Sequence, residues 1–255
     1  MIIAGCSGYD CVPLLFFYPV IGIILTIGGG RIGTFSAIWR GLDWSVLTDI
    51  LLSIIPALVC ITLHELAHGF VAYKLGDNTA KLAGRMTLNP LKHIDAMGLL
   101  MMVVFKFGWA KPVPVDPRNF TKSDMKTGML LTALAGPMAN LLLVFLGTLV
   151  VSLVEAAFFA KHYYFWLFMN YFIVLNANLA FFNLLPVPPL DGSKILFGIL
   201  PDRFYPKLYQ LERYGNVILL LLIITGATRL FIQPMSSGII QAFFDFFAFI
   251  GAYRQ

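Results

Sequence analysis

Long apolar runs constrain this chain more than any other feature. After residue 43 they occupy residues 44–76, 128–159, 164–185, 216–232 and 235–250, the last run being weaker and shorter than the others. A helix needs about 20 apolar residues to cross a bilayer, and residues 12–27 offer a possible extra span. Charged residues are only 12% of the 255, roughly half the share of a soluble domain. We therefore predict an all-α polytopic membrane protein with about five to six transmembrane helices.

Charge indicates how these helices are oriented. The loop between the first two runs is strongly basic, and its cations are Lys81, Arg85, Lys92, Lys106, Lys111, Arg118, Lys122 and Lys126. An excess of lysine and arginine in a short loop is typical of the cytoplasmic side. Between the second and third runs Lys161 and His162 are the only charged or titratable residues, which fits an external turn. The net charge of +5 then indicates contact with anionic membrane lipids and not with nucleic acid.

The basic loop also contains an apolar stretch that is too short to span the membrane as a helix. Residues 98–107 read "GLLMMVVFKF", which is rich in β-branched and aromatic residues. We predict a small membrane-associated β or re-entrant segment here, with residues 84–88, "GRMTL", as a partner strand. The proline-rich stretch that follows, "AKPVPVDPRNF", cannot form a regular helix.

One apolar run contains three ionisable residues, His64, Glu65 and His68, in the stretch "CITLHELAHGF". Such groups are costly in hydrocarbon and seldom occur there without a task. Residues four apart share one face of a helix, so His64 and His68 can direct two imidazoles at one metal ion. Glu65 lies next to the first ligand, where it can accept a proton from the attacking water. Two imidazoles suit zinc, although cobalt or iron would also bind such ligands.

A catalytic zinc needs a third protein ligand and an open position for water. His93 and Asp95 are in the basic loop, and Glu155 and His162 are near the opposite surface. Asp191, in "NLLPVPPLDG", follows the third run on the same side as the second half of the metal helix. It is the best candidate, but an aspartate there is as readily a turn or N-cap residue before a helix over residues 194–200.

Other polar residues in the apolar runs are expected to pack. Gly136 and Pro137 in "AGPMAN" can let a helix bend or another backbone approach closely, and Asn140 can then bond the freed groups. The asparagines of the third run are expected to join helices. Cys60, one turn before His64, reads as a small packing residue in preference to a thiol near the metal. His93 is expected to fix its loop and not to bind metal.

Five motifs together resemble the site-2 protease family of intramembrane zinc metalloproteases. They are "HELAHGFVAYKLGD", "NPLKHIDAMG", "GWAKPVPVDPRNF", "ALAGPMANLLL" and "NLLPVPPLDGSKIL", in the order found in the family. The resemblance implies that His64, His68 and Asp191 hold one zinc ion and that Glu65 is the general base. It also implies that Asn183 stabilises the oxyanion or positions the substrate. The chain resembles the compact members that lack a PDZ domain.

The resemblance covers residues 44–232, which we predict to be the protease core. Residues 1–43 form an N-terminal extension and residues 233–255 a C-terminal apolar segment. The implied enzyme is a zinc metalloendopeptidase of the cell membrane that hydrolyses peptide bonds in or near transmembrane segments, with an active site open to the cytoplasm. A helical substrate must unwind before hydrolysis, and the two predicted strands could pair with it by edge addition.

Two other functions compete with proteolysis. A metal or proton transporter would use buried histidine and aspartate as a pathway. It would need polar groups on both sides of the midplane, whereas this sequence concentrates its titratable groups on one side. An inactive binding relative is disfavoured because every expected catalytic residue is present.

Overall fold

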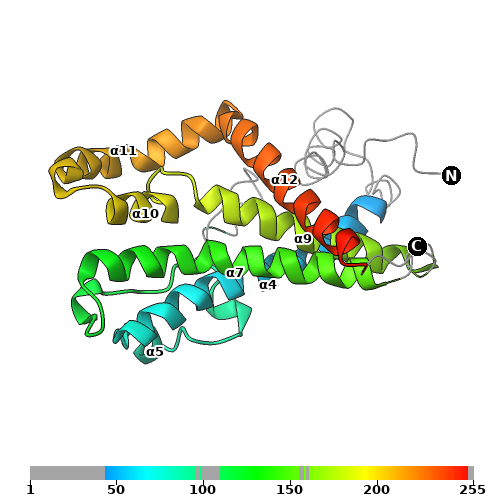
Figure 1. Ribbon diagram of the computed structural model, residues 1–255, viewed down its shortest axis with the longest axis horizontal. Helices are drawn as coiled ribbons and strands as arrows, with labels where there is room; N and C mark the ends of the chain where they lie inside the picture. Colours follow the sequence, from blue (N-terminus) through cyan, green and yellow to red (C-terminus); the bar gives the residue numbers. More distant parts are fainter. Residues whose placement is uncertain (1–43, 96–97, 99–109, 155–157, 159–160, 252–255) are drawn as a thin grey trace, which may run out of the picture.

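Helices dominate the part of the chain that the structure, a computed structural model, describes: residues 44–95, 98, 110–154, 158 and 161–251. The α-helices are α4 (Trp44–Leu75), α5 (Thr79–Leu82), α7 (Met125–Leu153), α9 (Tyr163–Asn183), α10 (Asp191–Ile199), α11 (Tyr205–Ile224) and α12 (Ala227–Phe249). Short 3₁₀ helices are η1 (Pro90–Lys92), η2 (Pro117–Asn119) and η3 (Asp202–Phe204). The predicted all-α class is therefore confirmed for these residues (Figure 1).

Three of these helices are long and apolar enough to cross a membrane. The candidate spans are Leu52–Leu75 in α4, Met125–Leu153 (α7) and Tyr163–Asn183 (α9). A fourth is possible if α11 and α12 count as one broken span. The described residues thus support three to four spans and not the predicted five to six. The possible span at residues 12–27 lies outside them.

The apolar runs predicted over residues 216–232 and 235–250 form two helices, but the break between the helices lies earlier than predicted. α11 ends at Ile224 and α12 begins at Ala227, with a bend of 75° between them. Gly226 occupies the break with a φ of 72°, a left-handed conformation that only glycine adopts at little cost. We expected the division near residue 233, but α12 runs continuously through it. The domain division itself stays a prediction.

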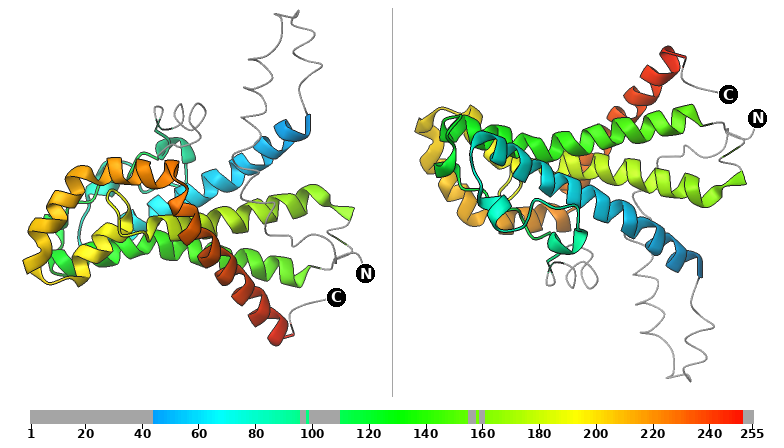
Figure 2. Two further views of the ribbon diagram at one scale, coloured as in Figure 1. Left: turned by 90° about the horizontal axis from the view of Figure 1, so that it is seen from above. Right: turned by 90° about the horizontal axis from the view of Figure 1, so that it is seen from below.

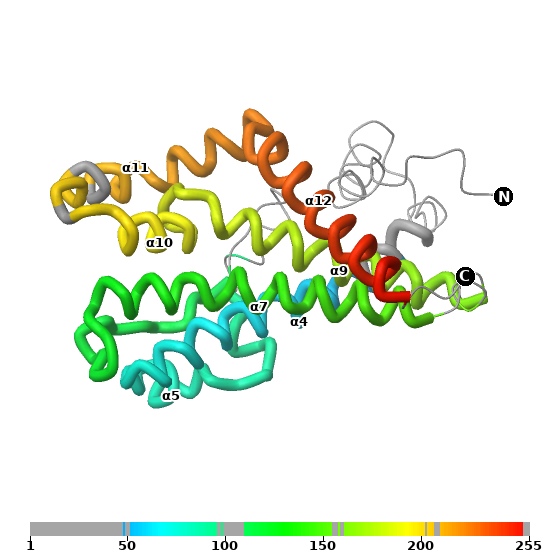
Figure 3. The backbone as a smooth tube through the Cα atoms, in the orientation of Figure 1, coloured from blue at the N-terminus to red at the C-terminus, as the bar shows by residue number. Residues whose placement is uncertain are grey.

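Helices α4, α7 and α9 pack against one another along the long axis of the molecule (Figures 2 and 3). α12 crosses α9 and α7, and Val144, Ile173, Ala177 and Ile240 form a buried cluster where these three helices meet. Only 33–39% of the residues in the candidate spans are buried. Their outer faces carry large exposed apolar side chains, such as Leu142 and Leu146 of α7, as expected where helices contact lipid.

The loop between α4 and α7 is irregular where the structure describes it. The strand expected over residues 84–88 is wrong, because this segment forms a turn and bends. No strand occurs among the described residues, and only an isolated bridge pairs Ile94 with Ala110. Apart from Gly98, the other expected strand lies outside those residues. The turn satisfies its backbone groups locally, since the Arg85 and Thr87 amides donate to carbonyls within the loop.

Two side chains, Asp77 just after α4 and Arg85, hold distant parts of this loop together. Asp77, which is fully buried, accepts hydrogen bonds from the Asp116 amide at 2.8 Å and from Asn119 at 3.1 Å. The guanidinium of Arg85 donates to the carbonyl of Lys111 at 2.5 Å. We call residues 110–116 the strap. These bonds hold the strap beside the second half of α4.

Candidate metal centre

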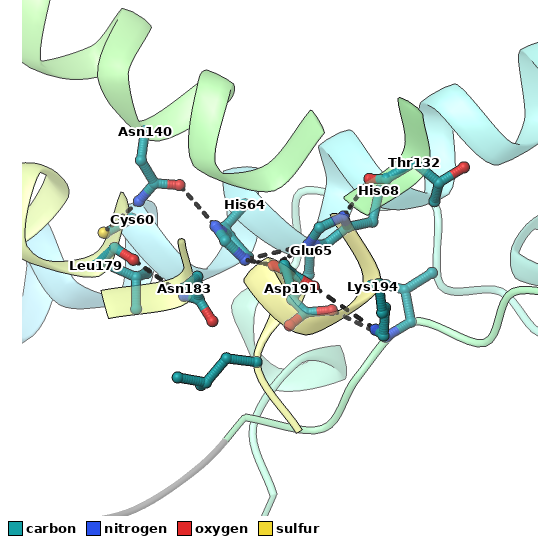
Figure 4. A network of polar contacts seen from close by, with 12 residues as sticks. Cys60, His64, Glu65, His68, Thr132, Asn140, Leu179, Asn183, Asp191 and Lys194 are labelled. Atoms are coloured by element: carbon teal, nitrogen blue, oxygen red, sulfur yellow. Dashed lines mark hydrogen bonds and ion pairs between the residues drawn. The ribbon is translucent and has the colours of Figure 1, made fainter. Parts of the chain in front are cut away.

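The two histidines of α4 lie one helical turn apart, as the sequence predicts. Both are buried, with 5% of His64 and 9% of His68 exposed. Their rings meet edge to face with centroids 4.7 Å apart. Because of this arrangement, the Nε2 atoms of the two rings are 3.1 Å apart (Figure 4).

Asp191 joins the histidines from the far end of the chain. After α9 ends, the chain turns back and α10 begins at Asp191 itself, with Leu190 in the N-cap position. This turn is tight, since a Cβ on Gly192 would lie 2.3 Å from the carbonyl oxygens of Leu184 and Leu185. Asp191 Oδ2 lies 3.2 Å from His64 Nε2 and 3.1 Å from His68 Nε2.

The hydrogen bonds of the two rings decide what this group can hold. His68 Nδ1 lies 2.7 Å from the carbonyl oxygen of Thr132, which can only accept, so this nitrogen carries a hydrogen. His64 Nδ1 lies 2.9 Å from Asn140 Oδ1. With both Nδ1 atoms donating, two neutral rings direct bare Nε2 lone pairs at each other and at a carboxylate oxygen. Three acceptors at such distances repel one another unless a cation lies between them.

The dimensions fit zinc. Ligand atoms about 2.1 Å from a tetrahedral zinc lie roughly 3.4 Å from one another, and the three distances here are 3.1–3.2 Å. His64, His68 and Asp191 are also the one group of three potential ligands that converge within the described residues. Within that part of the chain they would supply three protein ligands to the ion, the number found in catalytic zinc sites.

Glu65 and Lys194 flank this group. Glu65 is half-buried, and its Oε2 accepts a hydrogen bond of 2.9 Å from the amide of Val113 in the strap. Lys194 Nζ lies 3.6 Å from Asp191 Oδ1, the oxygen that faces away from the histidines.

A family model described as Peptidase family M50 matches residues 52–226. The chain belongs to this family. The match includes α7, α9, α10 and the part of α4 from residue 52 onward, which carries both histidines. The resemblance drawn from the five motifs is thereby confirmed.

Relatives of this M50 chain are named as zinc metalloproteases. A Bacillus subtilis protein provisionally named zinc metalloprotease YwhC is 42% identical over 186 residues, 71% of this chain and 84% of the relative. The Mycolicibacterium smegmatis protein provisionally named zinc metalloprotease Rip2 is 31% identical, over 74% of this chain and 71% of the relative. A zinc metalloprotease of Methanocaldococcus jannaschii is 26% identical, over 95% of this chain and 55% of its own length. No solved structure matches significantly.

These relatives agree with the enzyme class and the metal predicted from the sequence. The chain is a zinc metalloprotease of peptidase family M50. Its ligand set, its general base and its substrates are taken up below as proposals, because membership of the family does not test them residue by residue.

Asn183, expected to stabilise the oxyanion, lies near the metal centre but does not bond to it. Its Nδ2 donates to the carbonyl of Leu179, four residues earlier in α9, at 3.0 Å. The side chain is half-buried, and Figure 4 shows it near His64, bonded to Leu179 of its own helix. An amide nitrogen has two hydrogens, so one remains for another acceptor.

The other candidate ligands lie elsewhere. His93 Nε2 lies 2.9 Å from the Thr87 carbonyl, and Asp95 accepts from the Gly98 amide at 2.8 Å, so both fix their loop. His162 is exposed at the start of α9, and Glu155 lies outside the described residues. Cys60 is buried with 3% exposed and is not part of the metal group, as the packing interpretation expects.

Sequence reasoning missed the residues that orient the two imidazoles. Asn140 was expected to bond helix backbone groups freed near Pro137, but its oxygen faces His64 instead. Thr132 gave no signal, because its backbone carbonyl and not its side chain contacts His68. One sign was available in the sequence. Asn140 lies four positions after Gly136 in an apolar helix, so both residues are on the same helix face.

Proposed function

We propose that this chain is an intramembrane metalloprotease that hydrolyses peptide bonds in or near the transmembrane segments of other membrane proteins. One observation carries the proposal. Three metal-binding atoms from His64, His68 and Asp191 converge within 3.2 Å of one another, with a glutamate next to the first ligand, in a bundle of helices apolar enough to cross a membrane.

His64, His68 and Asp191 are proposed to hold the zinc ion. When bound, zinc supplies Lewis acidity that makes a water more acidic and polarises the scissile carbonyl. The three residues reach the ion from two separate helices, α4 and α10, and the burial of their side chains keeps competing solvent away. Lys194 draws the second oxygen of Asp191 outward, which leaves one oxygen for the metal.

Glu65 is proposed to be the general base. Its position next to His64 lets it accept a proton from the attacking water and pass that proton to the leaving amine. The Val113 amide occupies Oε2, so Oε1 is the oxygen available for the proton. Because the strap carries this amide, the strap is also expected to orient the base.

Asn183 is proposed to stabilise the oxyanion that develops on the scissile carbonyl. The hydrogen bond to Leu179 fixes one N–H of the amide, and the other N–H is available to the substrate. One such donor contributes about 3 kcal/mol to transition-state stabilisation. A substrate helix must unwind locally to expose its carbonyl to this donor, because a helix otherwise hides its peptide bonds in its own hydrogen bonds.

The metal centre is proposed to open toward the cytoplasm. α4 ends, α7 begins and α9 ends at the same end of the molecule, near α5, α10 and α11 (Figure 1). Lys81, Lys111 and Lys122 belong to the loop between α4 and α7, and Arg203 to the one between α10 and α11, whereas Lys161 lies between α7 and α9. By the positive-inside rule, this distribution supports a cytoplasmic position for the first end.

The decisive experiment compares two glutamate-to-glutamine substitutions. Wild type, Glu65→Gln and Glu212→Gln are each co-expressed with a panel of single-span membrane proteins, and products and bound zinc are measured. Glu212 is an exposed glutamate of α11, so its substitution makes the same chemical change away from the centre. Loss of a general base typically slows a reaction by 10²–10⁴-fold.

Glu65→Gln is therefore expected to keep its zinc and lose cleavage, while Glu212→Gln keeps both. Equal product from Glu65→Gln and wild type would refute the assigned base. Transport of zinc by wild type into sealed vesicles, with no cleavage of any panel member, would refute proteolysis as the function.

A further inference from the structure

We infer that two buried asparagines, Asn140 and Asn176, act as positioning residues that determine which ring nitrogen of His64 carries its hydrogen. They keep Nε2 of His64 bare and directed at the metal. The inference deepens the proposed function and depends on it for its purpose. Its central measurement, described below, is made without metal and without substrate.

The two asparagines form a continuous chain of hydrogen bonds behind His64. Both side chains are fully buried, Asn140 in α7 and Asn176 in α9. Asn140 Oδ1 lies 2.9 Å from His64 Nδ1, and Asn140 Nδ2 lies 3.3 Å from Asn176 Oδ1. Asn176 Nδ2 donates to the carbonyl of Phe172 at 2.7 Å, and Asn140 Nδ2 also donates to Cys60 Sγ at 2.9 Å.

The Phe172 carbonyl, at the end of this series of hydrogen bonds, determines which group donates and which accepts in each of them. The Phe172 carbonyl can only accept, so Asn176 must turn its NH₂ group toward it and its oxygen toward Asn140. That oxygen in turn requires the NH₂ group of Asn140, which leaves the oxygen of Asn140 facing His64. The ring must then donate from Nδ1. A backbone carbonyl thus sets the hydrogen position of an imidazole on another helix.

The arrangement matters because Asp191 favours the opposite hydrogen position. Its Oδ2 lies 3.2 Å from His64 Nε2, and without metal a carboxylate attracts a hydrogen to that nitrogen. A ring hydrogenated at Nε2 cannot bind metal through that nitrogen, which is the one that faces Asp191 and His68. The two asparagines oppose this outcome, because the oxygen of Asn140 accepts a hydrogen bond only from a ring that carries its hydrogen on Nδ1. His68 obtains the same result directly, from the Thr132 carbonyl.

The test uses ¹⁵N-histidine labelling of the full chain in detergent, without metal. The chain has four histidines, so the ring signals can be assigned by single substitutions, and their ¹⁵N shifts distinguish hydrogen on Nδ1 from hydrogen on Nε2. The variants are Asn140→Leu, which removes the acceptor, Asn176→Leu, which does not contact His64, and Asn140→Asp, which restores an acceptor. The matched control is Thr148→Val, a fully buried residue of α7 that bonds only to its own helix.

We expect hydrogen on Nδ1 of His64 in wild type, Asn140→Asp and Thr148→Val. Asn140→Leu is expected to move it to Nε2, and Asn176→Leu to give a mixture, because Asn140 is then free to turn over. Zinc affinity, measured by chelator competition, should fall about 10–100-fold for Asn140→Leu and about 2–10-fold for Asn176→Leu. It should be unchanged for Thr148→Val.

Hydrogen on Nδ1 of His64 in both leucine variants would overturn the inference, as would hydrogen on Nε2 in wild type. If Asn140→Leu does not fold, the ring shifts of Asn176→Leu are compared with those of Thr148→Val. Only Asn176→Leu interrupts the hydrogen bonds that lead to His64. A wild type that cleaves no substrate but shows the expected shifts would defeat the proposed function and leave the positioning role intact.

Discussion

Replacing Gly136 by alanine is expected to close the metal centre. Gly136 lies in α7 directly against the two imidazoles and is itself buried. A Cβ at this position would lie 2.4 Å from His68 Nε2 and 2.6 Å from His64 Cε1. Both distances are below 3.0 Å, the limit under which neighbouring atoms must shift.

The required shift is large on the scale of metal coordination. Restoring ordinary contact at 3.4 Å needs a displacement of about 1 Å, whereas metal–ligand distances tolerate about 0.2 Å. The rings cannot retreat freely, because each is held from behind by a bond of its Nδ1, to Asn140 or to the Thr132 carbonyl. A misplacement of about 1 Å can cost 10²-fold in rate, and we expect zinc affinity to fall by at least a similar factor.

Zinc affinity by chelator competition and the melting temperature of the metal-free protein in detergent together test this prediction. Gly238→Ala is the control for the substitution itself, because a Cβ there meets nothing within 4 Å in α12. Gly147→Ala is the control for crowding within α7, since its Cβ would lie 2.8 Å from Ile173 Cγ1. We expect Gly147→Ala to lower the melting temperature with zinc affinity unchanged.

The reasoning would be refuted by a Gly136→Ala protein that binds zinc as tightly as wild type. It would also be refuted if Gly147→Ala weakened zinc binding as much as Gly136→Ala, because crowding anywhere in α7 would then explain the loss.

Two further predictions concern the loop beside the metal centre. Burial raises the pKa of Asp77, but hydrogen bonds from Thr79, Asp116 and Asn119 lower it overall, below its ordinary value of 3.8. Its charged form therefore stabilises the fold above that pH, and this contribution disappears as the pH falls through the lowered pKa. Asp77→Asn should cost about 1–3 kcal/mol at neutral pH, measured by thermal unfolding, with the difference from wild type shrinking below about pH 4; a constant difference would contradict the assignment. Val113→Pro removes the N–H that donates to Glu65 Oε2. It should slow cleavage about 10-fold or more with zinc retained, whereas Val115→Pro in the same strap should not. Equal rates for the two variants would argue against orientation of the base by Val113.

Much of the fold could be predicted from local sequence. The three candidate spans correspond to the apolar runs predicted over residues 44–76, 128–159 and 164–185. The first span begins eight residues later than its run, and the second ends six residues earlier, at Leu153. The strand expected over residues 84–88 was wrong because β-propensity reflects packing against neighbouring strands, and the described loop offers none. The break at Gly226 was missed because a glycine alone does not reveal whether a helix continues through it.

The candidate site divides in the same way. His64 and His68 share a helix face by virtue of their spacing alone, and Glu65 adjoins them in sequence, so this half of the centre is a local property. For Asp191 the sequence spacing left ligand and N-cap equally open, and only the resemblance favoured a ligand. The turn after α9, tight enough to require Gly192, brings its carboxylate to the histidines.

What the sequence determined by itself is therefore the helical periodicity, the apolar length of each run and the pairing of two imidazoles, because these depend on contacts between residues a few positions apart. Only the tertiary structure decided which carboxylate joins the two histidines, that Gly136 lies against their rings, and that Asn140 and the Thr132 carbonyl contact their Nδ1 atoms. These depend on the approach of α7 and α10 to α4, across up to 127 residues of chain. Such distances are set by how whole helices pack, which no short window of sequence contains.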